Sequence, residues 1–414
     1  MKPTEALITK AYKAAVSLRN ATDAQLKKTL MMLAAEMEKH TSKIIAANKK
    51  DVAKQDADDP RTDRLLLNSQ RIRSIAASVR KVAKLPNPSG QILEKKTLHN
   101  GLLLEKISVP LGVVGAVYES RPNVTFDIAA LCLRSMNAAV LKGSKEAEHT
   151  NIASVALIKK VLKANNIHPD CITLLPSERE SVADLFSATK YVDVIIPRGS
   201  AGLIEYVRKN SLVPVIETGA GVCHIFVDKT AKVQNAVNIT VNAKVQRPSV
   251  CNAIDTILLQ EDIAPTFLSK LQPEFEKYGV EIFADSKSYR LLKNYPHLQK
   301  AKPEDFGREF LSLKCAVKIV KHIDEALLHI SKYSTKHSEA IISENKANCK
   351  RFLKEVDAAT VYANASTRFT DGEEFGLGAE IGISTQKLHA RGPFALEKLV
   401  TEKWVITGNG QVRK

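Results

Sequence analysis

Cys251 is the residue around which a chemical site can be built. It lies in the stretch 242–252, just after a helical pattern and just before an apolar, strand-like run at 253–259. Because Pro248 disfavours continuation of the helix, the thiol is expected on a turn between two regular elements. Such a turn can aim a nucleophile at a ligand. Most free cysteines are instead small buried hydrophobes, so position alone leaves both interpretations open.

Two strand-to-helix turns carry groups that suit phosphates. The segment Pro-Arg-Gly-Ser-Ala-Gly at 197–202 follows an apolar run and opens a helical one, where backbone N–H groups can bind a phosphate. It is only half of a dinucleotide fingerprint, so a simple tight turn is an equal alternative. Lys142 and Lys145 flank Gly143 and Ser144 at the end of another predicted strand. Two such turns in consecutive strand–helix units favour a nucleotide site.

Three further polar residues follow predicted strands. Arg121 and Asn123 come after the strand 113–117, and Glu217 comes after the strand 213–216. Ligands gather at the carboxyl ends of parallel strands. Arg121 could bind a carboxylate or phosphate, Asn123 could donate to an oxyanion, and Glu217 could be a general base. Each also has a structural interpretation, as part of a proline turn, a helix cap or a salt-bridged acid.

The regular elements that must position these residues change in type along the chain. Residues 3–85 predict amphipathic helices, with Thr22 as a cap. Two strand-like runs at 91–98 and 102–109 enclose Asn100-Gly101, a strong hairpin signal. From residue 110, short apolar runs alternate with helices, which predicts two parallel sheets with a boundary near 219–221. The predicted strands are 113–117, 139–141, 171–174, 192–196, 213–216, 224–227, 254–259, 317–320 and 360–362. The segment 364–382 is irregular and rich in glycine, which is typical of a functional segment, and 404–407 reads as a last strand.

Composition restricts the class of protein. The 414 residues suggest two or three domains, and neither the N-terminus nor any apolar run suggests a signal peptide or a membrane span. Without a C-x-x-C pair the six cysteines argue against a zinc site or a disulfide framework, and predict no bound metal and a reducing, cytoplasmic location. They are Cys132, Cys171, Cys223, Cys251, Cys315 and Cys349.

The net charge of +16 has two interpretations, nucleic-acid binding or binding of small anions. The lysines are spread along helical faces, and 5% aromatic residues offer little for base stacking. We therefore expect mostly solvated helix surface, a small anionic ligand and no nucleic acid. A non-catalytic nucleic-acid-binding or regulatory protein is the alternative from another class.

Four segments together resemble one enzyme family. The segments 109–115, 118–125, 215–221 and 375–393 are similar to those of gamma-glutamyl phosphate reductases, also called glutamate-5-semialdehyde dehydrogenases, in the aldehyde dehydrogenase superfamily. The similarity runs over nearly the whole chain. It implies NADPH-dependent reduction of L-glutamyl 5-phosphate to L-glutamate 5-semialdehyde and phosphate, the second step of proline biosynthesis from glutamate.

The resemblance also implies an architecture. It is an α/β fold of the aldehyde dehydrogenase type, with two doubly wound parallel-sheet domains and a β-hairpin oligomerisation arm. Residues 1–88 and 110–218 would form the cofactor-binding domain, 219–395 the catalytic domain, and 89–109 with 396–414 the arm. A homo-oligomer is expected, and a contact with the glutamate 5-kinase that supplies the acyl phosphate is left open.

The family's site residues map onto this chain one by one. Cys251 matches the catalytic cysteine, and Glu217, 34 residues before it, matches a strand-end glutamate. Lys145 stands where NAD-using members commonly carry an acid, which favours NADP(H). The residues implied to bind the cofactor are Lys142, Ser144, Lys145, Gly199, Ser200 and Glu309.

The resemblance implies a thioester mechanism. The thiolate of Cys251 attacks the acyl carbon, phosphate leaves, and hydride reduces the thioester. Backbone N–H groups near the cysteine, with Asn123, would stabilise the oxyanion. Arg121 and Arg198 are expected to bind the substrate. Lys244 or Arg247 could favour the thiolate or bind substrate. A hydrolytic aldehyde dehydrogenase is the alternative, and there Glu217 would be the essential base.

Overall fold

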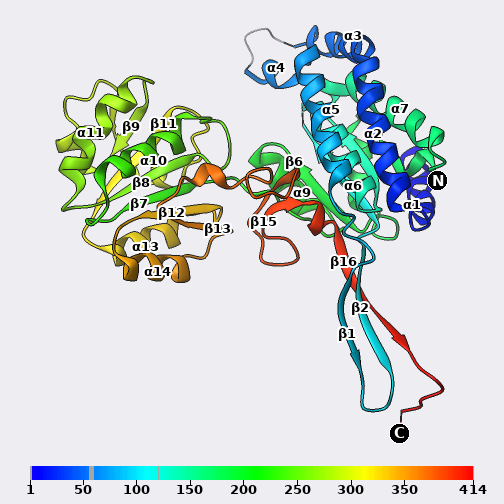
Figure 1. The fold of residues 1–414 in the computed structure, drawn as a ribbon. Coiled ribbons are helices and arrows are strands. Elements are labelled where there is room, and N and C mark those ends of the chain that lie inside the picture. The colour runs from blue at the N-terminus through cyan, green and yellow to red at the C-terminus, as the bar shows by residue number, and fades with distance from the viewer. Residues whose placement is uncertain (1, 56–59, 120, 414) are drawn as a thin grey trace. The chain divides into compact units, whose positions relative to one another are not determined.

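The computed structural model describes residues 2–55, 60–119 and 121–413, and the chain divides into two compact units (Figure 1). The predicted α/β fold with two parallel sheets and a β-hairpin is confirmed. Each unit is formed by segments that are distant in the sequence. Unit 1 consists of Met1–Thr218, Gly376–Gly382 and Phe394–Lys414, and unit 2 of Gly219–Phe375 and Ile383–Pro393.

The sheet of unit 1 is parallel and has the order β5-β4-β3-β6. Strand β3 (Val113–Tyr118) is buried along its whole length, as expected for a strand covered on both faces. The chain order reverses at β3, so the carboxyl ends of β3 and β6 form a topological switch point, where open α/β sheets bind ligands. The other strands are β4 (Ala138–Gly143), β5 (Ile172–Leu174) and β6 (Val194–Arg198).

The helices of unit 1 begin at the signals that the sequence carries. Thr22 and Gln25 form a capping box at the start of α2, and Asn68 caps α5 with its side chain. Helix α6 is buried almost all round, which fits its nearly continuous apolar sequence. The helices are α1 (Pro3–Leu18), α2 (Asp23–Lys39), α3 (Thr41–Val52), α4 (Pro60–Leu65), α5 (Ser69–Lys84), α6 (Asn123–Arg134), α7 (Glu148–Ala164), α8 (Arg179–Phe186) and α9 (Ala201–Asn210), with 3-10 turns η1 (Lys145–Ala147), η2 (Pro169–Cys171) and η5 (Leu396–Lys398).

A three-stranded antiparallel sheet, called the arm here, extends from unit 1 (Figure 1). Its strands are β1 (Ile92–Thr97), β2 (Leu103–Pro110) and β16 (Val400–Thr407), with β2 in the middle. The hairpin turn has Gly101 at φ +83°, a backbone conformation that glycine adopts without strain. The arm is thinly covered, and half or more of Ile92, Leu93 and Ile406 is exposed.

The sheet of unit 2 is parallel and has seven strands in the order β10-β9-β11-β8-β7-β12-β13. Alternate residues of the same strands pack on opposite faces. Ile225 and Ile257 belong to the core with α10 and α11, whereas Phe226 and Leu258 pack with α13 and α14. The strands are β7 (Cys223–Val227), β8 (Ile254–Gln260), β9 (Glu281–Ala284), β10 (Leu298–Lys300), β11 (Lys314–Val320), β12 (Ser338–Ile342) and β13 (Thr360–Ala363). The helices are α10 (Val233–Val245), α11 (Ala264–Glu276), α12 (Ser286–Leu291), α13 (Ile323–Tyr333) and α14 (Lys346–Glu355), with 3-10 turns η3 (Pro303–Gly307) and η4 (Thr367–Phe369).

The predicted strand 213–216 is wrong. Only Val215 forms a bridge there, with Ile195. Ile195 donates to the oxygen of Pro214 and accepts from Ile216, and the proline has no N–H with which to extend the ladder. The remaining strands, β14 (Glu380–Ser384) and β15 (Gly392–Ala395), pair with each other.

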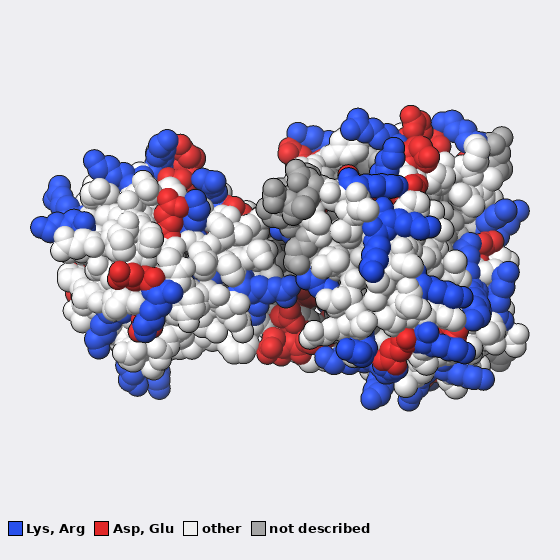
Figure 2. Space-filling view, turned by 90° about the horizontal axis from the view of Figure 1, so that it is seen from above, with Lys and Arg blue, Asp and Glu red and all other residues white. Residues whose placement is uncertain are grey.

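The surface is strongly charged but mixed in sign. On the face shown in Figure 2, lysine and arginine side chains are scattered with aspartate and glutamate among them. Within the described ranges, the structure contains no helix long and apolar enough to cross a bilayer.

Candidate active site

Cys251 lies on the predicted turn, between the end of α10 and the start of β8, and its side chain is partly exposed. Burial raises the pKa of each of the other five cysteine thiols and so disfavours their thiolates. The pKa rises to about 11 for Cys171 and about 12 for Cys315, and it also rises for Cys132, Cys223 and Cys349.

Gly221 fixes the backbone of the cysteine from the other side. A Cβ atom at this position would lie 1.6 Å from the carbonyl oxygen of Cys251, so only glycine allows this approach. The N–H of Gly221 donates to Oε1 of Glu309 at 2.8 Å. Unit 2 therefore brings Cys251 and Glu309 together around one glycine. Burial raises the pKa of Glu309, and the hydrogen bond from Gly221 opposes this rise.

The residue after the cysteine is tied to η4. Nδ2 of the buried Asn252 donates to the carbonyl oxygens of Arg368 (3.3 Å) and Thr370 (2.9 Å). In return, Oγ1 of Thr367 donates to the oxygen of Asn252 at 2.7 Å. These bonds hold an irregular segment firmly beside the nucleophile.

Arg368 is a candidate residue that sequence reasoning missed. Its guanidinium donates to Oδ1 of Asn252 and to Oε1 of Gln246. The only signal was indirect, since the segment 364–382 was predicted to be functional from its length and irregular composition. Nothing in that pattern singled out the arginine.

Lys244 does not have the expected position. Its side chain is fully buried, with Nζ 3.6 Å from Oδ1 of Asp255 and 3.3 Å from the oxygen of Ser312. The thiol whose pKa its charge lowers is Cys315, against the larger effect of burial. Because Lys244 is fully buried and paired inside the core, it does not fit the expected contact with substrate, and an effect of its charge on the Cys251 thiolate stays a prediction.

At the switch point of unit 1, a carboxylate occupies the predicted phosphate site. The backbone N–H and the hydroxyl of Ser200 both donate to Glu119, each at 2.7 Å. A Cβ on Gly199 would lie 2.6 Å from the same carboxylate. The start of α9 is thus shaped for an anion, which fits a cofactor pyrophosphate, and in this structure Glu119 provides the negative charge.

The neighbouring strand end carries the predicted ribose and phosphate ligands. Nζ of Lys142 is largely buried and donates to the oxygens of Gly143 and Ser177, each at 3.0 Å. Burial lowers the pKa of Lys142. Oγ of Ser144 is buried and, within the described residues, makes no hydrogen bond, so it is ready for a ligand. Lys145 is exposed at the start of η1.

The residues after β3 make local contacts. Nδ2 of Asn123 donates to Oδ2 of Asp127 at 2.9 Å on the same helix, so at least one amide proton is already used. Burial raises the pKa of Asp127 to about 6, against the opposing effects of Asn123 and of the Arg198 charge. Arg121 belongs to the turn before α6. The roles of Asn123, Arg121 and Arg198 toward substrate stay predictions.

Glu217 is half-buried and lies 3.8 Å from Nε of Arg208 on α9. This is an ion pair within unit 1, the structural alternative that its sequence position had left open. Cys251 belongs to unit 2. The common role of Glu217 and Cys251 stays a prediction.

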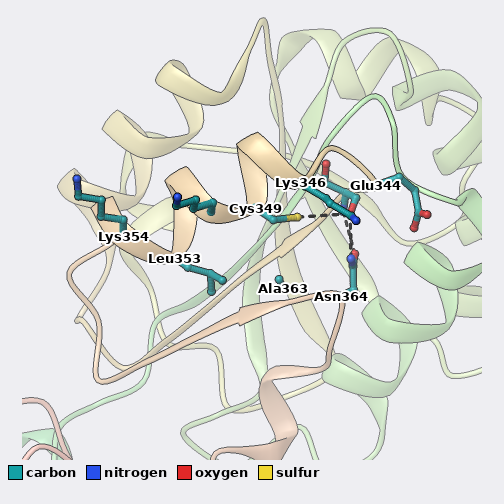
Figure 3. Close-up of a pocket in the computed structure, with 9 residues that line it drawn as sticks. Glu344, Lys346, Cys349, Leu353, Lys354, Ala363 and Asn364 are labelled. Carbon is teal, nitrogen blue, oxygen red and sulfur yellow. Dashed lines mark hydrogen bonds between the residues drawn. The ribbon is translucent and has the colours of Figure 1, made fainter.

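A cavity of about 650 Å³ lies elsewhere in unit 2, between α14 and the end of β13 (Figure 3). Lys346, Lys350 and Lys354 of α14 border it, together with Cys349, whose Sγ donates to the oxygen of Ser343. None of the predicted site residues lines this cavity. Cys349, the second partly exposed cysteine, therefore lies among residues to which no role in the reaction is assigned.

Comparisons with known proteins show the family and the fold of the chain. The profile of the Aldehyde dehydrogenase family matches residues 2–288. The gamma-glutamyl phosphate reductase of Chlorobium chlorochromatii is 52% identical over 404 residues, covering 97% of this chain and 96% of that protein. The crystal structure of gamma-glutamyl phosphate reductase from Thermotoga maritima matches with a TM-score of 0.96 and 41% identity, over 100% of both chains. An engineered glycolyl-CoA reductase with bound NADP+ shares the fold, with a TM-score of 0.68 and 15% identity, over 98% of this chain and 97% of the other.

Proposed function

The chain belongs to the gamma-glutamyl phosphate reductase family of aldehyde dehydrogenase-type oxidoreductases, and we propose that it reduces L-glutamyl 5-phosphate with NADPH. The products are L-glutamate 5-semialdehyde, phosphate and NADP+. This reaction is the second step of proline biosynthesis from glutamate. The observation that carries the proposal is the partly exposed Cys251, held against Gly221 beside Glu309.

The cysteine carries the acyl group. Sγ of Cys251 attacks the acyl carbon, the bond to the phosphate oxygen breaks, and phosphate leaves with the electron pair. Bound NADPH supplies the hydride that reduces the thioester. Collapse of the resulting thiohemiacetal releases the aldehyde and regenerates the thiolate. The backbone N–H groups near Cys251 can stabilise the oxyanion, and their positions are kept by the bonds of Asn252.

NADP(H) is the proposed cofactor, and the residues of unit 1 fit it. The unpartnered buried Oγ of Ser144 can donate to it. Lys142 and Lys145 offer cations at the same strand end, and a cation at Lys145 attracts a 2′-phosphate. Gly199 and Ser200 can bind the pyrophosphate once Glu119 has moved away. Glu309 is proposed to hold the nicotinamide ribose. The fold neighbour solved with NADP+ bound supports this choice of cofactor.

No hydrolytic base is required in this direction. Glu217 is paired with Arg208, and its proposed role is to shape the site or to transfer a proton. We therefore favour the phosphate-dependent reaction over a hydrolytic aldehyde dehydrogenase. The proposed location is the cytoplasm, where cysteines are kept reduced.

The arm is proposed to pair copies of this chain. Both outer strands, β1 and β16, have an edge without a partner strand within the described residues. Their exposed apolar side chains include Ile92, Leu93 and Ile406. Exposed apolar edge strands bind further strands unless they are covered. A homo-oligomer formed through the arm would cover them.

Two measurements test the proposed reaction. Cys251→Ser should lower reductase turnover at least about a thousandfold, with NADPH binding by fluorescence unchanged. Cys349→Ser is the matched control and should keep its activity. In reverse, with glutamate semialdehyde and NADP+, the rate should require phosphate or arsenate. Near-normal turnover of Cys251→Ser rules out the thioester route, and a phosphate-independent rate indicates the hydrolytic enzyme.

A further inference from the structure

Two arginines belong to the immediate surroundings of Cys251. Arg247 lies on the turn that leads to the cysteine, and Arg368 comes from η4, more than a hundred residues later. The guanidinium of Arg368 donates to the side chain of Asn252, the residue directly after the nucleophile. Its Nε also donates to Gln246, the residue directly before Arg247, at 3.1 Å. Arg368 therefore joins both ends of the cysteine turn.

A buried network holds η4 in this place. Thr370 follows η4, and its Oγ1 accepts from the hydroxyl of Ser338 at 2.8 Å and contacts that of Tyr362 at 2.8 Å. Ser338 in turn contacts Nδ1 of His337 at 2.8 Å. Together with the hydrogen bonds from Asn252 to the backbone carbonyls of Arg368 and Thr370, these contacts hold the backbone of Arg368 in place. A flexible surface residue would not need such support.

The charge of Arg368 is partly buried and lies near a second cation. Burial is the main cause that lowers the pKa of Arg368, and the like charge of Arg247 lowers it further. The charges of Asp371, Cys251 and Glu374 oppose this effect. Asp371, however, already accepts hydrogen bonds from the backbone N–H groups of Glu373 and Glu374. A partly buried cation with a second cation near it gains from an anionic ligand.

We propose that Arg368 and Arg247 form an anion-binding pair at Cys251 that receives an oxyanion group of the substrate. The inference rests on the proposed function, because the acyl phosphate brings both a phosphoryl group and an α-carboxylate. A guanidinium binds either group through two parallel hydrogen bonds. The pair would hold the substrate with its acyl carbon near Sγ and would also favour the thiolate. Arg368 is thus a substrate-binding residue in addition to Arg121 and Arg198.

Alkylation of Cys251 tests the pair without any turnover. The full-length protein is treated with iodoacetate or iodoacetamide, and modification of the Cys251 peptide is followed by mass spectrometry. The two reagents differ in charge, so the ratio of their rates reports attraction of anions to the thiol. Arg368→Gln combined with Arg247→Gln should lower this ratio about tenfold. Arg351→Gln, on the exposed face of α14, is the control and should leave it unchanged.

Competition distinguishes the two anionic groups. Protection of wild-type Cys251 from iodoacetate by inorganic phosphate assigns the pair to the phosphoryl group, and protection by glutamate assigns it to the α-carboxylate. Protection by neither, or an unchanged rate ratio in the double variant, overturns the proposal. Two further variants serve if Arg368→Gln fails to fold. Arg247→Gln alone removes one charge from an exposed side chain, and Arg368→Lys replaces the guanidinium while keeping the charge. Should Cys251→Ser remain active, the proposed function fails while the alkylation ratio still reports on the pair.

Discussion

The two parallel sheets present their polar groups in different ways. In unit 1, two of the groups proposed to bind the cofactor are already occupied by the chain itself, since Ser200 donates to Glu119 and Lys142 donates to two carbonyl oxygens. In unit 2, Cys251 is held by backbone contacts, with Gly221 pressed against its carbonyl group. A site that binds and releases a cofactor can form hydrogen bonds to its own chain that break when the cofactor binds. A nucleophile needs a backbone that does not move.

Among the substitutions that test this comparison, Gly221→Ala has the largest expected effect, because it disturbs the rigid backbone around Cys251. The added Cβ would lie 1.6 Å from the oxygen of Cys251, so the cysteine turn must shift. A displacement of about 1 Å can cost about a hundredfold in turnover. Gly202→Ala is the control, because its Cβ would meet only Oγ of Ser200, at 4.0 Å. Equal steady-state kinetics of the two variants would contradict the importance of this contact.

Lys145→Glu should change the cofactor preference in unit 1. The substitution replaces attraction for a 2′-phosphate by repulsion, and NADPH affinity should fall about 10-fold to 100-fold while NADH affinity changes little. Fluorescence titration with both cofactors measures the ratio. Lys350→Glu reverses an exposed charge on α14 and should leave the ratio unaltered. An unchanged ratio in Lys145→Glu would place the 2′-phosphate elsewhere.

Glu119→Gln tests whether a side chain of the protein occupies the cofactor site in unit 1 until the cofactor replaces it. Without the carboxylate, the cofactor's pyrophosphate no longer displaces a charged competitor at the start of α9. A charge at a helix N-terminus is worth up to about 1 kcal/mol, so NADPH should bind up to about fivefold more tightly. The dissociation constant can be measured by calorimetry. Glu205→Gln, on the same helix and paired with Lys209, should bind NADPH normally. Weaker binding by Glu119→Gln would show instead that the carboxylate supports the bound cofactor.

Asp127→Asn should have the smallest effect, on stability. Burial raises the pKa of Asp127 to about 6, so the folded protein binds a proton more tightly than the unfolded chain. The contribution of this group to the free energy of unfolding is therefore largest below about pH 4 and is lost as the pH rises toward 6. Asn removes this slope and should add roughly 1–2 kcal/mol at pH 7, after allowance for partial exposure. Urea unfolding at pH 5 and pH 7 measures the difference, and a wild-type slope in Asp127→Asn would assign it to another group.

Much of the fold follows from local signals in the sequence. Thr22 caps α2, the Asn100-Gly101 hairpin forms, and most predicted strands lie within two residues of their observed bounds. Strand β12 was missed because Glu339 interrupts its apolar pattern. The structure buries this acid with hydrogen bonds from the backbone of His224 and the hydroxyl of Ser334. A partner 115 residues away leaves no local trace in the sequence.

In the candidate site, too, some residues could be predicted from the sequence and others could not. Cys251 could be singled out because a predicted turn, a proline and the match to the family's catalytic cysteine coincide there. Arg368 could not, because its importance depends on hydrogen bonds to Asn252 and Gln246, across more than a hundred residues. The stand-in role of Glu119 likewise depends on the pairing of β3 with β6, which brings Ser200 to it. Sequence patterns report the geometry of an element and not the contacts between distant elements.

The arm constrains how the chain can fold during its synthesis. Strand β16 pairs with β2 in register from Val400–Pro110 to Thr407–Leu103, although roughly 300 residues separate the partners. While the ribosome makes those residues, the edge of β2 that later pairs with β16 has no partner strand and can pair with other strands. We expect nascent chains and C-terminal truncations to depend on chaperones for this reason, since the last strand made closes the first hairpin.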